Sequence, residues 1–449
     1  MSPLGMLQAV LPATTLPPHL ANQAARVCGF SEVAPNEDDL AGPLFGSQCS
    51  HDKSVGYFLS TYAGYVAEGD FRNAGSSGGM GSWLQCELLR AGLVDHVINV
   101  VARTPDSSDR RLFAYRVASS ETEIRNGAKS KYYPVELSEV LGIVRRQPGR
   151  YAIVGLPCFI KAARLVCRED RLVAERLRWF VGLVCGQLKS MRFAELLSWQ
   201  MGIRPRDLVA FDFRKKLPTR PATDYGVEAT GSVNGSVRTV SSASTHLVGT
   251  NWGHGFFQYK ACDFCDDVFA EVADVVVGDA WLPRFSQDSG GTNILVVRRP
   301  ELDQIVQRAG QEGRLHLEPL AIEDVVESQA AGLRHRRDGL RYRLWQARKR
   351  GDWMPPKRVE AGRRHLSRGE QARYRLRERL QDLSHEGFAR AVTDDDLAGF
   401  LRSIQPVMAE YRRHRATTVQ RLRRKVHHLA GALRARLRAV LRRFAGPRR

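Results

Sequence analysis

Four short apolar runs constrain the fold of this chain more than any other feature. They are HVINVVA (96–102), YAIVGLP (151–157), FVGLVCG (180–186) and ADVVVGDAW (273–281). β-branched residues dominate these runs and charged residues hardly interrupt them, which is typical of strands buried on both faces of a sheet. Stretches with helical periodicity lie between them, at residues 80–92 and 159–179. This alternation predicts an α/β (mixed α+β) fold.

Composition divides the chain into three parts. Residues 1–54 form an N-terminal segment without a ferredoxin-like run of cysteines. Residues 55–327 hold the α/β core, and a part rich in Gly, Ser, Thr and Val (226–250) predicts an antiparallel hairpin inserted in it. Residues 328–449 read as an Arg-rich helical tail that Pro355 and Pro356 interrupt.

The tail carries much of the net charge of +20, and no acidic residue follows Glu410. Over residues 421–444, leucines and valines recur at three- and four-residue steps, with arginines on the other face. Such a basic amphipathic helix suits an anionic membrane surface or an acidic partner, but it could equally pack on the core through its leucines. The tail lacks the interleaved aromatic residues and the reading motifs of nucleic-acid binders, so nucleic acid is not a favoured partner.

The location expected from the sequence is the cytoplasm. The first residues lack a basic leader, prolines break their apolar run, and no stretch approaches the roughly 20 apolar residues of a membrane span. The basic tail would allow a peripheral position at the inner face of the membrane. Cytoplasmic cysteines stay reduced and serve metals or catalysis more often than disulfides.

Four cysteines predict a metal site. Cys262 and Cys265 are two residues apart, whereas Cys158 and Cys185 each follow an apolar run. Open α/β sheets place their sites at the carboxyl ends of strands, and a helix N-terminus, as predicted at Cys158, stabilises a thiolate. Each single cysteine could instead be a small buried residue. Four thiolates suit a structural zinc ion or a 4Fe–4S cluster; the wide spacing favours the cluster without excluding zinc.

A loop rich in glycine and serine, residues 75–79, precedes the helix predicted from Met80. Backbone N–H groups in such a loop, at the positive end of a helix, form a cradle for an anion, typically phosphate. Ser76 and Ser77 could cap the helix or donate hydroxyls, and Arg72 could pair with a phosphate. An ordinary capped turn explains the pattern equally well.

In combination, these motifs resemble the coenzyme F420 hydrogenase/dehydrogenase beta-subunit family. The resemblance covers roughly residues 55–300, with weaker similarity to about Pro356. Its segments occur in the family's order: RNAGSSGGMGS, KSKYYPV (129–135), VGLPCFIKAARLV, VGLVCGQLKS, FDFRKK (211–216) and CDFCDD…ADVVVGDAW. Relatives include deazaflavin-dependent hydrogenase subunits and a 7-hydroxymethyl chlorophyll a reductase. Many bacterial members sit in polysaccharide gene clusters, which implies a setting in polysaccharide biosynthesis.

The resemblance implies an oxidoreductase with FAD and one 4Fe–4S cluster, and coenzyme F420 as an optional co-substrate. FAD would exchange a hydride with an organic substrate or deazaflavin, and electrons with the cluster. The implied cluster ligands are Cys158, Cys185, Cys262 and Cys265. The implied flavin contacts are Arg72, Ser76, Ser77, Gly78, Gly79, Ser130, Lys131, Tyr132 and Arg214. Lys131 and Arg214 could face a phosphate or flavin N1, and Asp279 could bind a ribityl hydroxyl or cap a helix.

Many members carry a ferredoxin-like cysteine run that this chain lacks, so its single cluster would take electrons from the flavin or from an unidentified donor protein. Two other functions stay open. One is a zinc-stabilised binding protein without catalysis, recruited to a membrane or a polyanion. The other is an electron-transfer subunit of a larger complex. The sequence assigns no acid–base residue, and the catalytic residues stay unknown.

Overall fold

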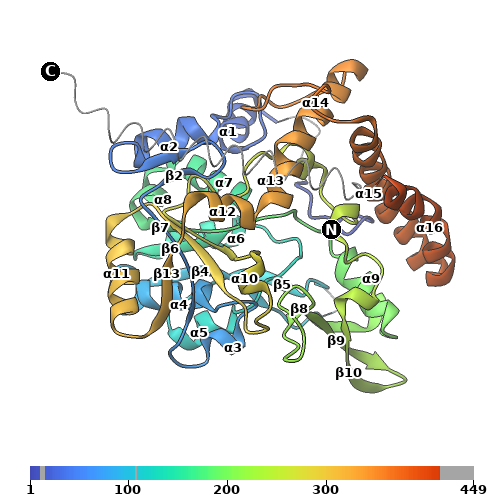
Figure 1. Cartoon of the computed structure of the whole chain (residues 1–449), viewed down its shortest axis with the longest axis horizontal. Coiled ribbons are helices and arrows are strands. Elements are labelled where there is room, and N and C mark those ends of the chain that lie inside the picture. Colours follow the sequence, from blue (N-terminus) through green and yellow to red (C-terminus); the bar gives the residue numbers. More distant parts are fainter. Residues whose placement is uncertain (11–15, 107–108, 415–449) are drawn as a thin grey trace.

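The computed structural model describes residues 1–10, 16–106 and 109–414, so the basic helix expected at residues 421–444 lies outside it. An eight-stranded sheet forms the centre, in the order β13-β3-β12-β11-β7-β6-β4-β5 (Figure 1). Its strands are β3 (Ser60–Val66), β4 (His96–Ala102), β5 (Phe113–Ala118), β6 (Tyr151–Gly155), β7 (Leu177–Leu183), β11 (Val275–Asp279), β12 (Asn293–Val297) and β13 (Leu315–Pro319).

The four apolar runs form the four neighbouring strands β11, β7, β6 and β4, which pair in parallel. The flanking strands β12, β3, β13 and β5 pair antiparallel. Every residue of β6 is buried, as expected for a strand covered on both faces. The predicted mixed α/β fold is therefore confirmed.

Two hydrophobic cores lie on opposite faces of this sheet, because successive side chains of a strand point to opposite sides. In β6, Ala152 belongs to one core and Ile153 to the other. The core of Ala152 includes side chains of α3 (Phe71–Ala74), α4 (Met80–Arg90), α5 (Glu121–Asn126) and α11 (Pro300–Gln311). The core of Ile153 includes those of α2 (Glu37–Phe45), α6 (Ser138–Arg146), α7 (Pro157–Glu169), α8 (Arg171–Arg176) and α12 (Ile322–Ser328).

The helical stretch predicted at 159–179 divides into three elements. Helix α7 ends at Glu169, and Asp170 then caps α8 by accepting a hydrogen bond from the backbone N–H of Val173 at 3.1 Å. The last residues of the stretch, from Leu177, begin β7. A capping carboxylate thus breaks a run whose helical periodicity looks continuous.

A second sheet holds the predicted hairpin. Strands β9 (Gly226–Val233) and β10 (Ser236–Ala243) pair antiparallel, and β8 (Leu208–Lys215) extends them to three strands. A third hydrophobic core joins this sheet to α9 (Arg192–Gln200), α15 (Arg368–Asp394) and α16 (Leu397–Arg413). The hairpin is therefore part of a separate layer, beside α9 in Figure 1.

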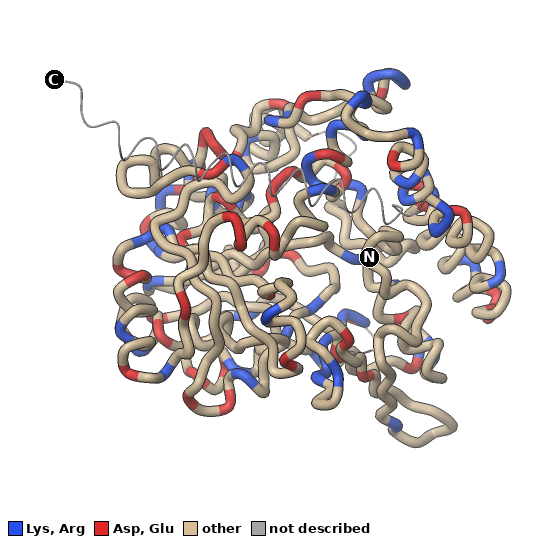
Figure 2. Tube along the Cα trace, in the orientation of Figure 1, with Lys and Arg blue, Asp and Glu red and all other residues tan. Residues whose placement is uncertain are grey.

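The remaining elements lie at the two ends of the chain and in the connections. They are α1 (Pro18–Val27), β1 (Ser50–Asp52), β2 (Gly56–Phe58), α10 (Pro283–Ser286), α13 (Ala330–Arg336) and α14 (Asp338–Arg350). Pro355 and Pro356 lie between α14 and α15, where the helices were expected to break. Acidic and basic residues are interspersed over the described chain (Figure 2). Within the described ranges, no helix is both long and apolar enough to cross a membrane.

Candidate functional site

A cavity of about 240 Å³ opens where β6, β7 and β11 end. Leu156, Cys185 and Asp279, at or just after the ends of these strands, line it together with the loops 75–79 and 127–133. The carboxyl ends of parallel strands are the usual position of a ligand site in an open α/β sheet. The cavity therefore lies where the sheet topology predicts a ligand-binding site.

The glycine loop forms one wall of the cavity. Gly79 has a φ of +84°, and a Cβ there would lie 2.5 Å from the carbonyl oxygen of Phe71. Gly79 offers α4 no side-chain cap, and the first N–H groups of the helix lack intrahelical partners. Asn293 Oδ1 accepts from the backbone N–H of Met80 at 3.1 Å, so an anion would use the N–H groups that follow Met80. A Cβ at Gly81, in that first turn, would meet no atom within 4 Å. The loop and the helix start therefore expose backbone to the cavity, as an anion cradle requires.

The two serines of this loop bind other loops and do not cap α4. Ser77 Oγ donates to the carbonyl oxygen of Thr292 at 3.0 Å. Ser76 Oγ accepts from the backbone N–H of Ser130 at 2.8 Å. Ser76 thereby joins the two loops that line the cavity.

The second loop brings Lys131 and Tyr132 to the cavity wall. Lys131 Nζ donates to the carbonyl oxygen of Ala128 at 2.6 Å, and burial lowers the pKa of Lys131 to about 7. The Tyr132 ring meets Trp252 edge-on, with ring centroids 4.8 Å apart. Trp252 also lines the cavity, although no sequence motif marked it.

Arg214 holds the glycine loop from behind the cavity wall. Its side chain is 4% exposed, and Nη1 lies 3.0 Å from Asp279 Oδ2. Nη1 also donates to Tyr132 Oη and Nη2 to the carbonyl oxygen of Ser76, both at 3.2 Å. Lys216, which sequence reasoning missed, donates to the carbonyl oxygen of Ser77 at 2.9 Å. Both cations therefore fix the conformation of the loop.

The structure brings six of the nine expected flavin contacts together at the cavity. Arg72 is directed elsewhere: its Nη2 lies 2.6 Å from Asp288 Oδ2, and its guanidinium stacks 3.5 Å from the Tyr65 ring centroid. Gly78 packs against Gly64, Arg214 lies behind the loop as described, and the remaining six contacts line the wall: Ser76, Ser77, Gly79, Ser130, Lys131 and Tyr132.

The four predicted cysteines also come together. Cys158 lies in the first turn of α7, Cys185 follows β7, and Cys262 and Cys265 lie in and after a short 3-10 helix, Lys260–Phe264. Burial raises the pKa of the Cys185 thiol to about 12; Arg336 opposes this effect, and the neighbouring Cys262 and Cys265 add to it. Burial, and then the other three cysteines, also raise the pKa of the Cys158 thiol.

The four thiols are close enough to affect one another's pKa values. Among the described residues, no group of three or more His, Cys, Asp or Glu is arranged to hold a metal ion as it stands. Four thiolates on one zinc ion would lie about 3.8 Å apart, given a Zn–S bond of about 2.3 Å and tetrahedral geometry. A 4Fe–4S cluster separates its ligands further, because each thiolate binds a different iron. Four cysteines are a ligand set that both a structural zinc ion and a 4Fe–4S cluster take.

Comparison with known proteins places both parts of this site in one family. Residues 61–142 match the N-terminal part of the coenzyme F420 hydrogenase/dehydrogenase beta subunit, and residues 149–323 match its C terminus. The chain belongs to this family. The two matches contain all thirteen expected site residues; helices α13 to α16 lie beyond them.

Two individual proteins are similar to this family member. The coenzyme F420 hydrogenase subunit beta of Methanococcus voltae is 25% identical over 206 residues, which are 43% of this chain and 63% of the relative. The chain thus spans less than two thirds of that relative's length. A chain of the F420-reducing [NiFe] hydrogenase complex from Methanosarcina barkeri is 14% identical, with a TM-score of 0.48 over 71% of this chain and 100% of that one.

The segment beyond the family match contributes Arg336 to the cysteine site. Its Nη2 donates to the carbonyl oxygen of Gly186 at 2.8 Å and lies 3.8 Å from Cys185 Sγ. On the other side, the backbone N–H of Leu188 donates to Cys262 Sγ at 3.3 Å. Sequence reasoning missed Arg336, because nothing in its Arg-rich surroundings distinguishes it from the neighbouring arginines.

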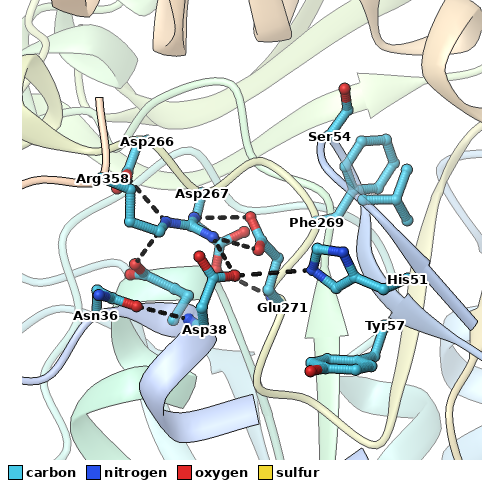
Figure 3. Close-up of polar contacts among 12 residues, drawn as sticks. Asn36, Asp38, His51, Ser54, Tyr57, Asp266, Asp267, Phe269, Glu271 and Arg358 are labelled. Atoms are coloured by element: carbon cyan, nitrogen blue, oxygen red, sulfur yellow. Dashed lines mark hydrogen bonds and ion pairs between the residues drawn. The ribbon is translucent and has the colours of Figure 1, made fainter. Parts of the chain in front are cut away.

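An ionic network fastens the loop that follows Cys265 (Figure 3). Arg358 pairs with Glu271 at 2.7 Å, with Asp266 at 3.2 Å and with Asp38 of α2 at 3.0 Å. Burial, and then Glu271, raises the pKa of Asp267, which lies in the same group. Segments from both ends of the chain therefore meet behind the cysteine loop.

Proposed function

We propose that this protein is an iron–sulfur flavoprotein oxidoreductase, with FAD in the cavity and one 4Fe–4S cluster on the four cysteines. One observation carries the proposal: Cys185 lines the same cavity as Ser76, Ser130 and Tyr132. A flavin held by the two loops would therefore lie beside a ligand of the cluster. When bound, FAD supplies both hydride and one-electron chemistry, and the cluster supplies one-electron chemistry.

The chain's own residues would bind and orient the cofactor. The backbone N–H groups at the start of α4 would face the phosphates, since a helix N-terminus favours negative charge. Arg214 and Lys216 keep the loop in place through its carbonyl oxygens. Lys131 and Tyr132 would contact the flavin from the opposite loop, where protonated Lys131 would favour an anionic group.

The substrate class follows from the family name. We propose a small organic redox substrate, with coenzyme F420 as a co-substrate to test, because the Methanococcus voltae relative is an F420 hydrogenase subunit. That relative is one subunit of an enzyme, which supports a protein as the electron donor. Cytoplasmic location, polysaccharide biosynthesis and binding of the basic tail to an anionic membrane belong to this proposal as well.

The experiment is cofactor analysis of protein purified without oxygen. We expect about four irons per chain, a visible absorption band from the cluster, and released FAD. Helix α7 offers a matched pair of variants, because Cys158 is an expected ligand, whereas Cys167 contributes to the hydrophobic core. Cys158→Ala should lose the iron and the band, and Cys167→Ala should keep both.

The outcomes separate the competing functions. One zinc per chain, with no iron and no flavin, would overturn the proposal in favour of the zinc-stabilised binding protein. Iron without flavin, in protein that is folded, would favour the electron-transfer subunit. Equal iron loss in the Cys158→Ala and Cys167→Ala variants would show only that α7 is sensitive to substitution. That result would contradict the assignment of Cys158 as a specific cluster ligand.

A further inference from the structure

Arg336 is a buried cation without a carboxylate partner. Its relative exposure is 1%, and its contacts within the described chain are the carbonyl oxygens of Gly186 and Cys262 and the sulfur of Cys185. Its Nε has no hydrogen-bond partner in the described part of the chain. A buried charge is costly unless an opposite charge or several hydrogen bonds compensate it. The site must therefore offer Arg336 negative charge from another source.

The four cysteines would be that source once they bind a metal as thiolates. Arg336 Nη2 lies 3.8 Å from Cys185 Sγ, and Nη1 lies 3.5 Å from the carbonyl oxygen of Cys262. Two other buried arginines bind oxygen atoms instead. Arg377 donates to the carbonyl oxygen of Gly253 at 3.1 Å and to the side-chain oxygens of Gln187 at 3.0 Å and Gln258 at 2.8 Å. Arg298 instead donates to backbone carbonyl oxygens, among them that of Ala273 at 2.9 Å. Arg336 thus differs from its buried counterparts in facing sulfur.

We propose that Arg336 is a positioning residue that supplies a fixed positive charge to the cluster and stabilises its reduced state. This inference rests on the proposed function. A 4Fe–4S cluster with four thiolate ligands would carry a net negative charge, and one-electron reduction would add one more negative charge. A guanidinium beside a ligand sulfur, shielded from water, favours the more negative of the two states. The electron comes from an external reductant, and no covalent bond is formed or broken.

The position of Arg336 is fixed by the segment that the family match does not include. The match ends at residue 323, and Arg336 is the last residue of α13. The next residue, Arg337, pairs with Glu271 at 3.1 Å, and Arg358 pairs with the same carboxylate. These ion pairs hold α13 against the loop of Cys262 and Cys265. The C-terminal helices are therefore inferred to set the potential of a site built by the core.

The test is a redox titration of the full-length protein with dithionite, followed by the electron paramagnetic resonance signal of the reduced cluster. Arg336→Gln removes the charge, and Arg336→Lys keeps it. Arg343→Gln is the control: Arg343 is also buried, and it donates to the carbonyl oxygens of Asp263 at 2.8 Å and His335 at 3.2 Å, without a hydrogen bond to a cysteine sulfur among the described residues. We expect Arg336→Gln to shift the reduction equilibrium at least about tenfold toward the oxidised cluster, equal to about 59 mV. Arg336→Lys and Arg343→Gln should shift it less than about threefold.

Each outcome decides the inference. Wild-type protein without iron would overturn the proposed function and this inference together. Iron at the wild-type level in Arg336→Gln, with an unchanged potential, would overturn this inference alone. If Arg336→Gln loses the cluster, the iron content of Arg336→Lys becomes the test. A cluster retained in Arg336→Lys would show that the site requires a positive charge at this position. Loss in both variants would show that the shape of the guanidinium matters and not its charge.

Discussion

Substitution of Gly79 by alanine tests the cradle directly. Gly79 precedes α4 with a φ of +84°, a conformation that costs other residues about 1–2 kcal/mol. The added Cβ would lie 2.5 Å from the carbonyl oxygen and 2.6 Å from the carbonyl carbon of Phe71, and 2.7 Å from the backbone nitrogen of Arg72. These are backbone atoms, so the loop must move to accommodate the methyl group.

We expect Gly79→Ala to lower the free energy of unfolding by about 2–4 kcal/mol, combining the conformational cost with the strain of the overlap. The displaced loop should also lose its FAD. Urea denaturation of the protein measures the first effect, and the flavin content after gel filtration measures the second.

Gly81→Ala is the matched control, two residues along the same chain. Its Cβ would meet no atom within 4 Å, and alanine in a helix is favoured over glycine by up to about 1 kcal/mol. Gly81 lines the cavity, so this variant should fold at least as stably as wild type and still bind FAD less well. Equal stability of the two variants would refute the assigned backbone geometry. Undiminished FAD in Gly81→Ala would refute the position of the flavin beside α4.

Two further predictions concern the packing around the site. Arg358→Gln should cost about 1–3 kcal/mol in urea unfolding, because it removes one of the two cations that pair with buried Glu271. Arg350 forms an exposed pair with Asp352, so Arg350→Gln should change the free energy of unfolding by less than about 0.5 kcal/mol. Similar losses in both variants would contradict the network. Burial lowers the pKa of His254 and His385 from 6.5 to about 4. As the pH falls from about 6.5 to about 4, these histidines become protonated in the unfolded chain before they do so in the folded chain. The free energy of unfolding therefore decreases over this pH range. The double His→Gln variant should lose less stability over the same range, and an unchanged pH profile would count against buried, neutral histidines.

Some of the site could be predicted because its patterns are local. The apolar runs marked the four parallel strands, and Pro157 marked the start of α7, so Cys158 and Cys185 could be assigned to neighbouring strand ends. The glycine loop before α4 could be recognised in the same way. These features depend on the period of a strand, the start of a helix and the conformational freedom of glycine, which short sequences determine.

Long-range partners could not be predicted in this way. Arg214 and Asp279 are 65 residues apart, and Arg336 and Cys185 are 151 residues apart. The sequence suggested that Arg214 faces a phosphate or flavin N1. In the folded chain Arg214 lies behind the loop, where its buried guanidinium binds a carboxylate and a carbonyl oxygen.

The sequence by itself determined the strands, the cysteine pattern and the family. Only the tertiary structure decided which cations hold the glycine loop, that Cys185 belongs to the cavity wall, and that an arginine from the C-terminal helices faces the thiols. The physical reason is that local patterns specify secondary structure, whereas the burial and pairing of a charge depend on every segment packed around it.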